Sequence, residues 1–162
     1  SPPPAGSRPT PRELRRERRA AGCASSPLFE SRRADGTGTA CAFDMFIGGE
    51  RIPTMFDLGA NANLMNRRAA RSFGIRTRQS RNSAGVDGAF GATIVATELF
   101  VWQPTIGSTR WQRSSFLVAD FPIFEALNLH KKPAAIAGTR LLEGRDFIID
   151  FAGKRLLVSS RR

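Results

Sequence analysis

The chain has 162 residues, 41% of them apolar, and a formal net charge of +11 at pH 7. This length suits one domain with some non-globular sequence, and no apolar run approaches the roughly 18 residues of a membrane span, so no membrane association is expected. The sequence starts at Ser1 rather than Met, as expected of a processed or excised piece, and shows no signal segment.

Two cysteines, Cys23 and Cys41, and one histidine, His130, limit the chemistry that the chain can perform. They are too few for a disulfide framework or a metal site. Two reduced thiols favour an intracellular location. A hydrolase of the Ser/His/Asp or Cys/His type would have to use His130, which stands alone in a polar stretch, and this disfavours that class.

The positive charge is concentrated in two segments. Residues 1–33 hold eight Arg and three Glu, and residues 67–82 hold six Arg and no acidic residue. We predict that residues 1–38, rich in Pro and Arg, are a disordered basic tail, and that residues 39–160 are the folded domain. The tail is interpreted as a soluble linker, and weak contact with nucleic-acid phosphates is the alternative.

After the tail, the pattern is mostly that of β-strands. Residues 42–47 and 50–56 predict two strands joined by a Gly-Gly hairpin turn. Residues 66–74 predict a short helix that has Asn66 at its N-cap and Gly74 past its end. The remaining predicted elements are a strand at 92–102 preceded by a glycine-rich hairpin tip, a strand at 111–118, a helical turn at 122–129, a short strand at 134–138, a short helix at 139–144 and a closing hairpin at 147–158.

A carboxylate stands where the second predicted strand ends. Asp57 follows that apolar strand and is followed by Leu58, Gly59 and Ala60. Glycine permits a tight turn and close approach of the backbone, and the N–H groups of such a turn can hold a carboxylate. Because Asp-x-Gly turns are common, this feature alone does not predict catalysis.

The order of the elements resembles the retropepsin-like aspartic proteases, the single-lobed retroviral and retrotransposon type, over residues 42–158. Residues 55–65, Met-Phe-Asp-Leu-Gly-Ala-Asn-Ala-Asn-Leu-Met, look like the catalytic loop of that family. Residues 135–142 and 147–151 look like its second half, where a strand passes through the loop that bears the aspartate. The resemblance implies a mostly β fold, a closed-barrel acid-protease single lobe with two short helices, a flap hairpin and a homodimeric active site.

The activity implied by the resemblance is that of an aspartic endopeptidase. Asp57 would be the catalytic residue, and Leu58, Gly59 and Ala60 would form the active-site loop. Because the chain holds one such motif, a second chain would supply the second carboxylate. The substrate would be a peptide, for example a polyprotein, and no cofactor is required. The flap that closes over it would include Gly85, Val86, Asp87, Gly88 and Ala89.

Leu58 departs from the pattern of the family. The usual residue after the aspartate is Thr or Ser, whose hydroxyl hydrogen-bonds across the dimer below the aspartates, and a leucine side chain cannot do this. A catalytically inactive retropepsin-like dimerisation or binding module is therefore an alternative. A basic nucleic-acid-binding protein is a second alternative, although the sequence shows no zinc knuckle or helix-turn-helix motif.

Overall fold

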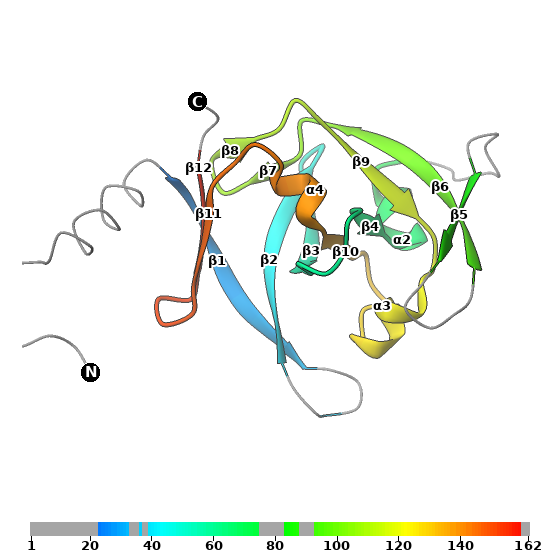
Figure 1. Ribbon diagram of the computed structural model, residues 1–162, viewed down its shortest axis with the longest axis horizontal. Coiled ribbons are helices and arrows are strands. Elements are labelled where there is room, and N and C mark those ends of the chain that lie inside the picture. The colour runs from blue at the N-terminus through cyan, green and yellow to red at the C-terminus, as the bar shows by residue number, and fades with distance from the viewer. Residues whose placement is uncertain (1–22, 33–35, 37–38, 75–82, 88–92, 160–162) are drawn as a thin grey trace, which may run out of the picture.

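The computed structural model describes residues 23–32, 36, 39–74, 83–87 and 93–159 (Figure 1). The strands are β1 (Cys23–Arg32), β2 (Thr39–Ile47), β3 (Glu50–Phe56), β4 (Leu64–Met65), β5 (Ser83–Asp87), β6 (Thr93–Trp102), β7 (Thr105–Ile106), β8 (Thr109–Arg110), β9 (Arg113–Val118), β10 (Ala135–Ala137), β11 (Phe147–Asp150) and β12 (Arg155–Ser159). The helices are α2 (Arg67–Ser72), α3 (Pro122–Ala126) and α4 (Thr139–Leu142). The described residues thus form a mostly β fold, as predicted.

The prediction of two short helices is wrong by one, because three are present in the described ranges. The additional helix is α3, where the sequence predicted only a helical turn. Pro122 occupies its first turn, where a missing backbone N–H costs no hydrogen bond and the fixed φ of proline suits a helix. Phe124 is 1% exposed and anchors this helix in the core.

The hairpin of β2 and β3 forms where the sequence predicted it. Its turn contains Gly48 and Gly49, whose φ angles of 58° and 88° lie in the left-handed region that such a tight turn requires. Side chains of β3 then alternate between two apolar clusters. Ile52 and Phe56 pack in the larger cluster and Met55 packs in the smaller one, so β3 separates the two parts of the core.

A strand from the second half of the chain passes through the centre of the first half. β10 lies between β3, to which it is parallel, and β4, to which it is antiparallel. Ile136 of β10 is paired with Met55 of β3 and with Leu64 of β4. Ala135 and Ala137 are fully buried, as expected of small residues in a strand covered on both faces. The residues that follow β3 and β10 are therefore brought side by side.

β1 belongs to the folded domain, so the predicted tail boundary at residue 38 is wrong for Cys23–Arg32. Its first half pairs antiparallel with β12 and its second half with β2, as the blue and red strands of Figure 1 show. Leu28 of β1 packs in the larger core cluster. Residues 1–22, where the basic tail was predicted, lie outside the described residues.

The sheet follows an open path. Its order is β11-β12-β1-β2-β3-β10-β4-β9-β6-β5, with β7 and β8 as a side branch from β2. The first and last strands of this path are not paired with each other within the described part of the chain, so closure into a barrel stays a prediction. No helix in the described ranges is both long and apolar enough to cross a bilayer.

Candidate active site

Asp57 lies directly after β3 and its side chain is exposed. Its backbone N–H donates to the carbonyl oxygen of Ala137 at 3.0 Å, which continues the pairing between β3 and β10 by one residue. The Asp57 Oδ1 atom accepts from the Gly59 N–H at 2.9 Å, and the Ala60 N–H donates to the Asp57 carbonyl oxygen at 3.2 Å. The turn that follows β3 therefore fixes the direction of this carboxylate while leaving it open to solvent.

Gly138, the residue after β10, is pressed against the loop that Asp57 begins. A Cβ atom at this position would lie 2.5 Å from the carbonyl oxygens of both Ala60 and Ala62. The φ angle of Gly138 is −85°, so close packing rather than backbone conformation requires glycine here. The Thr139 N–H donates to the Ala60 oxygen at 2.9 Å and the Gly138 N–H to Asn63 Oδ1 at 3.1 Å. These contacts lock the loop onto the start of α4.

Asn63 connects the same loop to β9. It is 1% exposed, its Nδ2 donates to the Ser115 carbonyl oxygen at 3.0 Å, and its own carbonyl accepts from the Leu117 N–H at 2.8 Å. The bond to Ser115 and the bond from Gly138 satisfy the nitrogen and the oxygen of the buried side-chain amide, and the bond from Leu117 satisfies the backbone carbonyl. This role of Asn63 was not predicted, and the signal for it was a polar residue between Ala62 and the apolar Leu64.

Asn66 caps α2, as predicted, and has a further role. Its Oδ1 accepts from the Ala69 N–H at 2.9 Å, which is the N-cap bond, and also from the Ala134 N–H at 3.2 Å. Its Nδ2 donates to the carbonyl oxygens of Leu129 at 3.2 Å and Lys132 at 2.7 Å. One buried amide thus holds α2 against the segment that leads into β10.

The other predicted loop residues occupy different environments. Leu58 is 56% exposed and stands beside the exposed Asp57, whereas Ala60 is half-buried. Gly59 is exposed, and a Cβ atom on it would lie 3.2 Å from Asp57 Oδ1, which is closer than an ordinary contact. A single exposed apolar side chain is common on protein surfaces. The exposure of Leu58 is therefore compatible with an interface but does not by itself indicate one.

Three of the five residues predicted to form the flap lie within the described part of the chain. Gly85, Val86 and Asp87 lie in β5, which pairs antiparallel with the first half of β6 and is the last strand of the sheet path. Gly88 and Ala89, which were predicted to lie at the tip, fall outside the described residues. The two strands of a hairpin are therefore present where the flap was predicted.

The described residues give limited information on a metal site and on a nucleic-acid site. In the described ranges, no three His, Cys, Asp or Glu side chains lie close enough to hold a metal ion. Of the basic residues on α2, Arg67 forms a 4.0 Å ion pair with Asp120, and Arg68 donates to the His130 carbonyl oxygen at 3.1 Å. The rest of the basic segment after α2 lies outside the described residues.

The described geometry places a strand from the second half of the chain beside an exposed aspartate that is held by its own loop. The structure is similar to the crystal structure of a retropepsin-like aspartic protease from Rickettsia conorii, with a TM-score of 0.56 and 18% sequence identity, over 85% of this chain and 95% of that chain. The fold is therefore retropepsin-like.

The sequence places the chain within a family. The family model described as "Aspartyl protease" matches residues 44–149, which is more than half of the chain, so the protein belongs to the aspartyl protease family. No curated protein matches the chain.

Proposed function

We propose that the protein is an aspartic endopeptidase whose active site pairs Asp57 of one chain with Asp57 of a second. The observation that carries the proposal is the environment of this residue. Its carboxylate is exposed, its Oδ1 is held by the Gly59 N–H, and its backbone is tied to Ala137 of the threaded strand. A group held in this way is positioned before substrate arrives, which is what acid–base chemistry on a peptide bond requires.

Two such carboxylates would share one proton. Two carboxyl groups about 3 Å apart do not both ionise, because the two negative charges would repel each other. The aspartate pair of aspartic proteases is a well-known case. The ionised member would take a proton from a water molecule, and the protonated member would donate its proton to the carbonyl oxygen of the peptide. The chain has one Asp-Leu-Gly-Ala sequence, so the proposed mechanism needs the loop of a second chain.

Leu58 is the residue that would join the two loops. Its side chain is 56% exposed in the single chain, and full burial of a leucine is worth about 1.5–3 kcal/mol. Covering the exposed half would therefore contribute about 1 kcal/mol from each chain. In this proposal, apolar contact between two Leu58 side chains replaces the hydroxyl hydrogen bonds of the usual family motif.

The interface would not use the backbone of β12. β12 is already hydrogen-bonded to β11 on one side and to β1 on the other. A strand that is paired on both sides has no backbone groups left for a second chain. We therefore place the proposed contact at the loop of Asp57 and Leu58, with the hairpin of β5 and β6 closing over the peptide and excluding water.

The test is cleavage of a mixed peptide library by the full chain and by two matched variants. Asp57→Asn should abolish cleavage and leave the melting temperature unchanged, because this side chain is exposed. Asp146→Asn, the same change at another exposed aspartate, should retain parental cleavage. Equal cleavage by the Asp57→Asn variant would overturn the assignment. A folded parent that dimerises but cleaves no peptide would instead favour the inactive binding module.

A further inference from the structure

Two segments that are distant in the sequence bring their basic residues together. The segments are α2 and residues 129–132, which lead toward β10. One buried amide joins them, because the Asn66 side chain caps α2 and donates to the carbonyl oxygen of Lys132 at 2.7 Å. Arg68 of α2 adds a hydrogen bond of 3.1 Å to the carbonyl oxygen of His130. The two segments therefore hold a fixed position relative to each other.

The two segments together form a basic surface. Its exposed cations are Arg68, Arg71, Lys131 and Lys132. None of these four forms an ion pair with any described residue, and neither segment contains an acidic residue. Of the two acidic residues that precede the second segment, Glu125 lies on α3 and Asp120 is already paired with Arg67 at 4.0 Å. The basic surface thus carries several positive charges that no described carboxylate neutralises.

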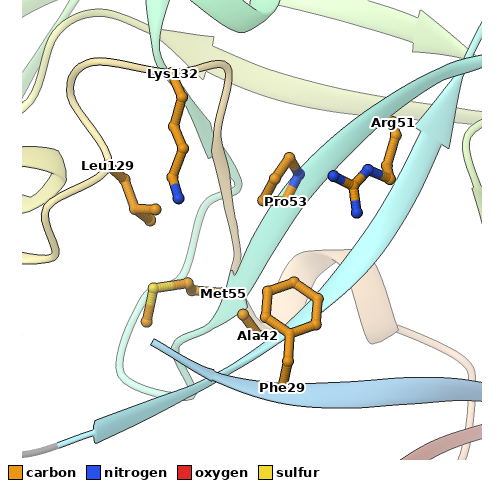
Figure 2. Close-up of a pocket in the computed structure, with 7 residues that line it drawn as sticks. All are labelled: Phe29, Ala42, Arg51, Pro53, Met55, Leu129 and Lys132. Atoms are coloured by element: carbon orange, nitrogen blue, oxygen red, sulfur yellow. The ribbon is translucent and has the colours of Figure 1, made fainter. Parts of the chain in front are cut away.

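A pocket marks one edge of the basic surface (Figure 2). It opens between β1, β3 and the segment before β10, and Lys132 lines it. In Figure 2 the amino end of Lys132 extends toward Pro53 of β3. The other cation that lines the pocket is Arg51, whose charge is paired with Asp44 at 3.3 Å. The unpaired cations of the basic surface therefore end at Lys132.

The surroundings of these cations favour one kind of polyanion. Among the described residues, no large apolar side chain of α2 or of residues 129–132 is exposed. A membrane-surface helix needs such groups to enter the lipid, and a single-stranded nucleic acid gains much of its affinity by stacking bases on exposed aromatic rings. A double-stranded nucleic acid needs neither, and it carries one negative charge for about every 1.7 Å of its axis.

We propose that the basic surface binds the phosphate backbone of double-stranded nucleic acid. Contacts from arginine and lysine to phosphates carry no sequence information, so the binding is independent of base sequence. The proposal assigns the contact to the folded domain rather than to the predicted basic tail. It does not depend on Asp57 or on peptide cleavage, so it and the proposed function can fail separately.

The first test is the salt dependence of binding, measured by fluorescence anisotropy with the full-length protein and a labelled duplex of mixed sequence. Four phosphate contacts predict a slope of log affinity against log salt of about −3.6 or steeper. Arg71→Gln combined with Lys131→Gln should make the slope less steep by about 1.8, and at about 0.1 M salt it should weaken binding at least about tenfold.

A matched double variant separates the basic surface from the net charge of the chain. Arg110→Gln combined with Lys154→Gln removes the same two charges at exposed positions on β8 and on the turn between β11 and β12. Figure 1 shows these elements on the side of the molecule away from α2. This variant should keep the parental slope and affinity. Circular dichroism should show both double variants folded, because all four side chains are exposed.

The site of binding can be read directly from the three lysines of the chain. When the protein is acetylated in the presence of the duplex and digested for mass spectrometry, Lys131 and Lys132 should be protected. Lys154, on the turn between β11 and β12, should react as in the free protein. Equal reactivity of Lys131 with and without the duplex would overturn the assignment.

The remaining outcomes of these measurements also decide the proposal. Equal loss of affinity in the two double variants would mean that net charge alone governs binding, and parental affinity in both would place the contact in another part of the chain. Tighter binding of the single strand, or of a polyglutamate peptide of equal charge, would assign the surface to another partner. Each of these results, and equally an absence of binding by the parent, would overturn the proposal.

Discussion

Gly138→Ala tests the structural basis of the site, because it places a methyl group where the loop and the threaded strand meet. The new Cβ atom would lie 2.5 Å from two backbone carbonyl oxygens, those of Ala60 and Ala62, and neither is the end of a flexible side chain. Overpacking of this kind costs roughly 1–3 kcal/mol. Displacing the loop would also weaken the bonds from Gly138 and Thr139, at about 1 kcal/mol each. The total is about 3–5 kcal/mol, taking both effects together.

The assay is thermal unfolding followed by circular dichroism, together with peptide cleavage at a temperature at which both proteins are folded. At roughly 4 °C per kcal/mol for a domain of this size, the melting temperature should fall by about 12–20 °C. Gly59→Ala is the control, because its Cβ atom would approach only the Asp57 side chain, at 3.2 Å. It should lower stability by less than about 1 kcal/mol and mainly reduce cleavage. A Gly138→Ala variant with parental melting temperature and parental cleavage would refute the proposed packing.

Two further changes address the support of the loop and the proposed interface. Asn66→Ala should lower the free energy of unfolding by roughly 3 kcal/mol, because the side chain is 1% exposed and its four hydrogen bonds are lost. The control is Asn61→Ala at an exposed site, which should change the free energy of unfolding by less than about 0.5 kcal/mol. Urea titration measures both, and equal stabilities would contradict the role of Asn66. Leu58→Thr should change the dimer dissociation constant little, whereas Leu58→Asp should raise it at least about tenfold by placing like charges beside the two aspartates. Sedimentation compares them, and identical constants for both variants and the parent would mean that Leu58 lies outside the interface.

Elements set by neighbouring residues were predicted well from the sequence. The β2–β3 hairpin follows from two glycines between apolar strands, and the start of α2 follows from Asn66 as a capping residue. The position of Asp57 after an apolar strand also follows from local pattern. These features depend on few residues that are close together in the chain.

Several features that depend on distant partners were not predicted, although the family resemblance did imply the strand that passes beside the aspartate. β1 contains Pro27 and several serines and has no regular apolar alternation, and it becomes a strand because β12, from the far end of the chain, pairs with it. Asn63 accepts from Gly138 and Asn66 accepts from Ala134, and both bonds form only when β10 and its flanking residues lie beside these side chains. The pocket is likewise assembled from several separate segments, so no single stretch of sequence indicates it.

A mixing experiment shows whether each of two chains contributes one Asp57 to the active site. Parent protein and the Asp57→Asn variant are combined in equal amounts under conditions that exchange subunits, at constant total concentration. If a working site needs an aspartate from each chain, random pairing leaves about one quarter of parental activity. Retention of about one half of parental activity would mean that each single chain holds a complete site, and the shared site would be wrong.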